Sequence, residues 1–110
     1  MNPYDKAHEL AKALSKDSLI TEYRSIKEQI LENKELNEKL ESFKEKRTEL
    51  QINTLQTGEI DKEAEEEVKK LYQELLTESL TVQYFEKEVK MNVLISDIQK
   101  IIYEDIKDLL

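Results

Sequence analysis

The segment "ISDIQKIIYEDIKDLL", Ile95 to Leu110, places five isoleucines and two leucines in a chain that is otherwise crowded with charge. An α-helix turns by about 100° per residue, and on that period the segment continues one apolar face: Met91, Leu94, Ile95, Ile98, Ile101, Ile102 and Leu109. An earlier apolar face points in nearly the opposite direction and consists of Val82, Phe85, Val89 and Val93. A helix that changes its apolar face meets different neighbours along its length, whereas a peripheral helix shows one stripe throughout.

The predicted last helix is also long. From Leu80 to Leu110 it would extend roughly 45 Å at about 1.5 Å per residue, whereas a compact domain of this length is only about 35 Å across. We therefore expect the helix to extend beyond its own globule, where an apolar stripe usually marks a partner. Self-association is the default because homo-oligomers are common. The alternative is a monomeric bundle in which a second helix covers the whole stripe.

Composition predicts an all-α protein. The 110 residues include one glycine and one proline, although sheets need turns and turns favour these residues. Apolar and charged residues each make up 38% of the chain, a balance typical of long helices when the apolar residues are periodic. We predict a single helical domain over residues 1–110, an oligomeric antiparallel helical bundle of four to five helices with long hairpin helices.

Helix boundaries are predicted at residues that cap or stop helices. They are Asn2–Pro3, the polar run Ser15–Ser18, Asn33, Thr57–Gly58 and Asp61. Asn33 is the least obvious of them, and we infer a cap there because the apolar spacing loses phase before Leu36. A further break near Ser79 is preferred to one continuous helix from Asp61 to Leu110, although no glycine or proline imposes it.

A heptad seam begins at Leu36. Its positions, at alternating steps of four and three, are Leu36, Leu40, Phe43, Arg47, Leu50 and Thr54. Arg47 either fixes the register of this seam or packs its stem while its guanidinium reaches water, and the second is preferred. The candidate oligomer or partner interface combines residues of this region and of the last helix: Leu36, Leu40, Phe43, Leu50, Leu55, Ile95, Ile98, Ile102 and Leu109.

Charge and composition disfavour several functions. The formal net charge is −8 and lysines alternate with glutamates, so nucleic acid and anionic lipid would be repelled. The lack of cysteine excludes disulfides, zinc–thiolate sites and cysteine-held clusters, and we expect neither a cofactor nor a metal. No apolar run approaches the length of a membrane span, and the first residues lack the pattern of a signal peptide, so we expect a cytoplasmic protein.

Individual polar residues predict no site. His8 is the single histidine, and the sequence offers it no nucleophile, orienting partner or companion ligand, so a surface or packing role is preferred. The carboxylates of Glu65–Glu67 occupy consecutive helix positions and diverge, which favours a solvated face over an ion site. Asp97 has two equal interpretations: an oligomer buries it beside a neighbour's Lys or Arg, or it faces solvent.

Several segments follow one another as they do in a known family. They are "YDKAHELAKAL" near the start, "EYRSIKEQI", "LESF", "QTG" at the predicted turn, "YFEKEV" and "SDIQKIIYEDIKDLL". With these the chain resembles, over nearly its whole length, the YheA/YmcA/YlbF family of small all-helical bacterial proteins, most closely its YheA-like branch. The C-terminal "SDI…I…IKDLL" contributes most to the resemblance.

The resemblance implies an α-helical, oligomeric, cytoplasmic protein without known enzymatic activity. Related branches look like regulators that work inside protein complexes and are linked to mRNA processing, competence, sporulation and biofilm formation. Some of their members hold an iron–sulfur cluster through cysteines, which this chain lacks. We therefore expect a non-enzymatic homo-oligomer that presents helix faces to itself and to other proteins. The alternatives are an enzyme with a carboxylate pocket between helices and a direct RNA-binding protein.

Overall fold

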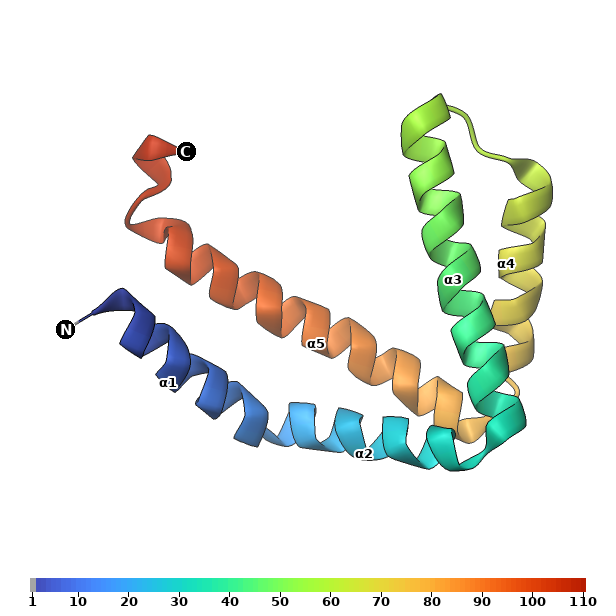
Figure 1. Cartoon of the computed structure of the whole chain (residues 1–110), viewed down its shortest axis with the longest axis horizontal. Helices are drawn as coiled ribbons and strands as arrows, with labels where there is room; N and C mark the ends of the chain where they lie inside the picture. Colours follow the sequence, from blue (N-terminus) through green and yellow to red (C-terminus); the bar gives the residue numbers. More distant parts are fainter. Residues whose placement is uncertain (1) are drawn as a thin grey trace. The chain divides into compact units, whose positions relative to one another are not determined.

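The computed structural model describes residues 2–110, and these residues are mostly helical (Figure 1). The helices are α1 (Pro3–Lys16), α2 (Ser18–Glu32), α3 (Lys34–Thr57), α4 (Lys62–Leu75) and α5 (Ser79–Glu104), followed by a 3-10 turn, η1 (Lys107–Leu109). Residues 2–110 form no strand, so the predicted all-α class and the expected number of helices are confirmed.

The chain divides into two compact units, each of which is described by itself. The first contains the residues up to Ile26 together with Tyr84–Leu110, and the second is Lys27–Gln83. Helices α2 and α5 contribute residues to both units. The single domain expected over residues 1–110 stays a prediction.

The capping residues identified in the sequence begin and end the helices. Asn2 Oδ1 accepts a hydrogen bond from the Tyr4 amide at 2.7 Å and opens α1, and Asn33 Oδ1 accepts one from the Leu36 amide at 3.2 Å and opens α3. Gly58 ends α3 with a φ of 74°, a left-handed conformation that glycine adopts without steric cost. These predicted boundaries are confirmed. They were predictable because caps satisfy helix-end groups through local contacts.

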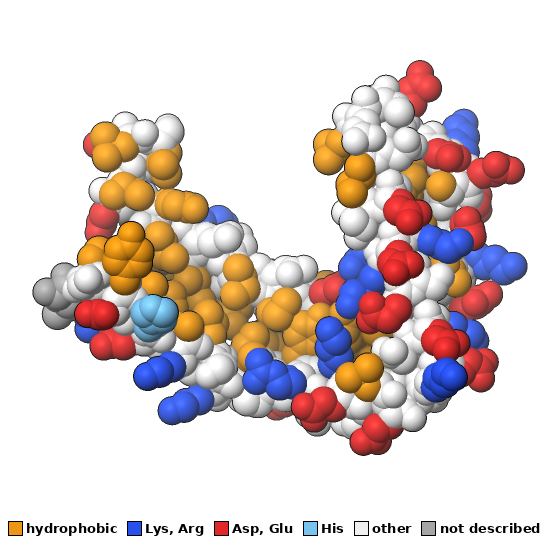
Figure 2. Space-filling model, in the orientation of Figure 1, with side chains coloured by type: hydrophobic (Ala, Val, Ile, Leu, Met, Phe, Trp, Pro, Cys, Tyr) orange, Lys and Arg blue, Asp and Glu red, His pale blue; other side chains and the backbone are white. Residues whose placement is uncertain are grey.

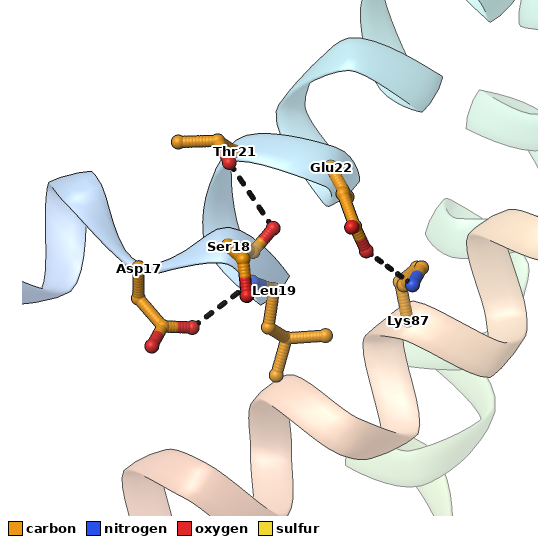
Figure 3. A network of polar contacts seen from close by, with 6 residues as sticks. All are labelled: Asp17, Ser18, Leu19, Thr21, Glu22 and Lys87. Atoms are coloured by element: carbon orange, nitrogen blue, oxygen red, sulfur yellow. Dashed lines mark hydrogen bonds and ion pairs between the residues drawn. The ribbon is translucent and has the colours of Figure 1, made fainter.

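The polar run between α1 and α2 forms the predicted interruption. Asp17 lies between the two helices in extended conformation, and its Oδ2 accepts a hydrogen bond from the Leu19 amide at 3.0 Å (Figure 3). The Thr21 hydroxyl donates to the carbonyl of Ser18 at 3.1 Å. Asp17 therefore acts as the cap of α2, which the sequence placed only within Ser15–Ser18.

The break between α4 and α5 is also confirmed. Helix α4 ends at Leu75 and α5 begins at Ser79. Thr81, in the first turn of α5, is fully buried, and its hydroxyl donates to the carbonyls of Leu75 and Glu78. A buried hydroxyl needs such partners, so Thr81 ties the start of α5 to the end of α4.

The last helix is shorter than predicted. Helix α5 ends at Glu104 rather than continuing to Leu110, and Leu109 lies in η1. The last turn of α5 carries no basic residue, and the end of the helix dipole that favours cations instead has three carboxylates, Glu104, Asp105 and Asp108, of which Lys107 pairs with Glu104 at 3.1 Å. The continuous helical stripe predicted as far as Leu109 is therefore wrong, and the apolar residues beyond Glu104 lie in turn and 3-10 structure.

Helices α3 and α4 form an antiparallel hairpin in the second unit (Figure 1). The Phe43 and Tyr72 rings lie 5.6 Å apart between centroids, inclined by 31°, which joins the two helices through an aromatic pair. Arg47 is half-buried, and its guanidinium carbon lies 5.1 Å from the centre of the Phe43 ring. Its stem thus packs as expected, but its head rests on an aromatic face.

In the first unit, α2 and α5 are joined by an aromatic contact and an ion pair. The Tyr23 and Tyr84 rings meet edge to face with centroids 5.1 Å apart. Glu22 Oε2 accepts a hydrogen bond from Lys87 Nζ at 2.6 Å (Figure 3). Helix α1, by contrast, has no buried residue.

Candidate interaction surfaces

The end of α5 and the turn after it expose an apolar surface. Along the predicted late face, Met91, Leu94, Ile95 and Ile98 are half-buried. Beyond them the exposed fraction is 73% at Ile101, 54% at Ile102, 49% at Tyr103 and 42% at Ile106. We call these last four the distal α5 residues, a group in which Ile106 lies in the turn just after the helix. Successive helix positions diverge by about 100°, so this end of the helix is apolar on more than one side. Figure 2 shows hydrophobic side chains gathered over α5 and the C-terminal turn.

The predicted early face of α5 begins buried and ends exposed. Phe85 is buried, whereas Val89 is 62% and Val93 54% exposed. Beside these valines lies a shallow hollow of about 370 Å³ lined by Val89, Asn92, Val93, Ser96, Asp97 and Lys100. The Asp97 side chain is exposed within the chain. Its burial in an oligomer stays a prediction.

The α3 residues of the predicted interface differ in their accessibility. Leu36, Leu40 and Phe43 are buried, with exposed fractions of 5%, 1% and 4%. Leu50 is half-buried and Leu55 is 85% exposed. The first three side chains form part of the core of this chain, and only the last two reach its surface in the native fold. A role of the seam in a partner interface stays a prediction.

The α3–α4 turn carries a second apolar surface. We call it the tip hollow: a depression of about 440 Å³ lined by Leu50, Gln51, Thr54, Leu55, Ile60 and Glu65. Its lining is mainly aliphatic, and Ile60 is 53% exposed. The neighbouring Ile52 is 49% exposed. Sequence analysis placed Leu55 in the interface but assigned no role to Ile60.

A third hollow, between α3 and α4, is charged rather than apolar. It measures about 290 Å³ and is lined by Lys46, Glu49, Leu50, Asn53, Asp61, Ala64 and Glu67. Two of its carboxylates already have partners: Asp61 caps α4 through the Ala64 amide at 3.2 Å, and Glu67 forms an ion pair with Lys46. These contacts cap α4 and join it to α3, so the charged residues of this hollow stabilise the hairpin.

The carboxylates of Glu65–Glu67 do not share a single partner. Lys69 Nζ lies 3.4 Å from Glu65 and 3.9 Å from Glu66, whereas Glu67 pairs with Lys46 on α3. The three carboxylates therefore do not converge on one cation, as expected for consecutive helix positions. Within residues 2–110 no three His, Asp or Glu side chains are grouped to hold a metal ion.

The Glu22–Lys87 pair was not predicted from the sequence. The hydrogen bond from Lys87, and then its charge, lower the pKa of the Glu22 carboxyl below its ordinary value of 4.5, and the charge of Lys90 adds to this. Both groups looked like ordinary surface charges because their helices are distant in sequence. The other single-residue candidate, His8, is exposed on α1.

A family model described as "Control of competence regulator ComK, YlbF/YmcA" matches residues 4–107. The chain belongs to this family. The match confirms the resemblance on which the sequence analysis relied, and it extends from α1 to the start of η1. The description associates the family with regulation of competence.

Relatives of this YlbF/YmcA-family chain are similar over almost their whole length. A UPF0342 protein of Alkalihalophilus pseudofirmus is 31% identical over 98% of this chain and 92% of the relative. A UPF0342 protein of Caldicellulosiruptor saccharolyticus is 32% identical over 97% and 91%. In Listeria monocytogenes a UPF0342 protein is 28% identical over 99% and 93%. The similarity thus covers all the helices. None of the described helices is long and apolar enough to cross a membrane.

Proposed function

We propose that this chain is a non-enzymatic cytoplasmic protein that assembles with copies of itself and acts by presenting helix surfaces to protein partners. The observation that carries the proposal is the exposure of the distal α5 residues, with fractions of 42% to 73%. Membership of a family described by the control of ComK supports a regulatory role that works through other proteins.

Exposed aliphatic side chains at the end of one helix favour a self-complementary contact. In a twofold dimer each copy contributes the same surface, so every side chain buried on one copy has a counterpart on the other. Fully burying an isoleucine stabilises by about 1.5–3 kcal/mol, and a half-exposed one by about 1 kcal/mol. Two copies contribute six isoleucines and two copies of Tyr103, and at about 1 kcal/mol each these eight side chains give about 8 kcal/mol, which is comparable to the cost of association, about 4–15 kcal/mol.

This balance makes the assembly sensitive to a single charge at the surface. Replacing Ile102 by Asp places two carboxylates in a twofold contact, and an unpaired buried charge costs several kcal/mol. Ile102 is more than half exposed within the chain, so the fold itself tolerates the change. We expect Ile102→Asp to be folded and monomeric in sedimentation velocity.

Gln73→Asp is the matched control because Gln73 is exposed and lies on α4 rather than among the distal residues. It adds the same charge to the chain outside the proposed contact and should sediment as the unaltered chain does. Ile98→Asp changes a half-buried side chain and should also dissociate the assembly, with a loss of helix content by circular dichroism. An Ile102→Asp chain that is folded and sediments unchanged would exclude the distal residues from the interface.

The cellular role is proposed from the family. The family description supports a link to competence. The resemblance adds mRNA processing, sporulation and biofilm formation as further roles of this kind, exerted through protein complexes. A strain that lacks the gene would be complemented by the unaltered chain and by Gln73→Asp, but not by Ile102→Asp at equal protein level. Full complementation by a monomeric Ile102→Asp chain would separate the function from assembly.

A further inference from the structure

The backbone around the tip hollow is held by its own hydrogen bonds. The Gly58 amide donates to the Thr54 carbonyl at 2.9 Å, which closes the end of α3. The Thr57 hydroxyl donates to the carbonyls of Asn53 and Glu59 at 2.9 and 3.0 Å. Because the polar groups find partners within the turn, the turn is ordered. Its exposed aliphatic side chains therefore form a fixed surface.

The tip hollow is apolar where it is open. Leu55 is 85% and Ile60 53% exposed, and Leu50 is a half-buried residue of the lining. The hollow is a shallow, open depression, which suits the side of a helix rather than an enclosed small molecule. Aliphatic side chains around a depression favour contact with an apolar side chain of a partner over contact with water.

The segment that carries the tip hollow is strongly acidic, and Glu65 is the carboxylate that lines the hollow itself. Residues 49–66 contain six carboxylates, at Glu49, Glu59, Asp61, Glu63, Glu65 and Glu66, against one lysine, Lys62. Lys69 offsets part of this charge through its contacts with Glu65 and Glu66. Carboxylates beside an apolar depression favour a cationic partner by electrostatic complementarity. A second copy that met this surface with its own tip hollow would bring the same carboxylates against it, and such a copy is disfavoured as the occupant.

We propose that the tip hollow docks a helical segment of a different protein, one whose aliphatic ridge is flanked by lysine or arginine. Leu55 and Ile60 contact the ridge, and the carboxylates of Glu59 and Glu63 face the flanking cations. Helix-in-groove recognition combines these features, with aliphatic anchors at three- and four-residue spacing. The surface lies within residues 50–65, apart from the distal α5 residues, so this partner and self-assembly use different sites.

The probe for this proposal is a fluorescent synthetic peptide of about 14 residues, a length at which an isolated helix is marginal in water. It carries leucines at helical spacing with lysines on both sides, and a matched peptide has glutamate at each lysine position. Fluorescence anisotropy measures binding to the full chain, and methyl NMR locates it. We expect the lysine peptide to bind, to shift the Leu55 and Ile60 methyl signals, and to weaken as salt is added.

Variants distinguish this site from general attraction of a cation to an acidic protein. Leu55→Ser and Ile60→Ser should each weaken binding by about tenfold or more, as truncation of an interface anchor does. Leu31→Ser is the matched control, because Leu31 is an aliphatic residue of the same unit, 57% exposed, that does not line the tip hollow. Glu59→Lys should weaken the lysine peptide and strengthen the glutamate peptide.

Three results would overturn the proposal. One is equal affinity of Leu55→Ser and Leu31→Ser for the lysine peptide, and another is equal binding of the two peptides. The third is a fall in the sedimentation coefficient of Leu55→Ser, which would make the tip hollow a contact between copies. The titration is repeated on the Ile102→Asp chain to separate this test from self-assembly. We expect unchanged peptide binding, because the two interactions use different sites.

Discussion

At the scale of single residues, the polar groups that stabilise this chain are few and specific. Thr81 is the buried polar side chain among residues 2–110, and its hydroxyl shares its one proton between two carbonyls at the α4–α5 junction. Sequence analysis placed the break near Ser79 but gave Thr81 no role, because a threonine in a polar run looks like a turn residue. Only the packing around it distinguishes it from its neighbours.

Thr81→Val keeps the shape of the side chain and removes its hydroxyl. The carbonyls of Leu75 and Glu78 then lose a buried donor, and we expect a loss of about 1–3 kcal/mol in the free energy of unfolding, measured with urea. Thr77→Val is the control: the Thr77 hydroxyl donates to the Glu74 carbonyl at 2.7 Å at an exposed position and should change stability by less than about 0.5 kcal/mol. Equal effects of the two variants would contradict this role of Thr81.

The Glu22–Lys87 pair predicts a pH dependence of defined sign. The pKa of Glu22 is lowered in the folded chain, so its contribution to stability is complete above the ordinary value of 4.5 and is lost as the pH falls through the folded-state pKa. A carboxyl titration by NMR should place the pKa of Glu22 below 4.5, and Lys87→Met should raise it toward 4.5. The expectation fails if Lys87→Met leaves the Glu22 titration unmoved.

At the scale of helices, most boundaries follow from local chemistry. Asn33 and Asp61 each accept a hydrogen bond from an amide three residues later, and Gly58 supplies the left-handed turn. These were predictable because a cap requires only its own neighbours. The end of α5 at Glu104 was not predictable from a breaker residue, since neither glycine nor proline lies there. The acidic residues at the end of the helix favoured an earlier stop, but the prediction gave more weight to the apolar pattern.

Gly58→Ala tests the turn between α3 and α4. An added Cβ meets no atom within 4 Å, so the cost comes from the φ of 74° alone. We expect a loss of about 1 kcal/mol in thermal or urea unfolding. Gly58→Asn should lose less, because asparagine tolerates left-handed backbone conformations. A Gly58→Ala chain as stable as the unaltered one would contradict a left-handed Gly58.

At the scale of the whole molecule, the sequence predicts the helices better than their surfaces. The seam residues Leu36, Leu40 and Phe43 are periodic and apolar, and such a pattern is the same for a core as for an interface. The structure buries them within the chain. The tip hollow was missed because Leu55 and Ile60 are separated by the α3–α4 turn and become neighbours only when the hairpin forms. Tertiary contacts therefore decide which apolar residues remain available to partners.

The most direct test of action through assembly is the solution mass of the unaltered chain by sedimentation equilibrium, over a range of concentrations. The chain mass is 13.0 kDa. We predict a mass of two or more times this value. For Ile102→Asp under the same conditions, the mass should fall toward 13.0 kDa. A single species of 13.0 kDa for the unaltered chain at the highest concentration would contradict the account.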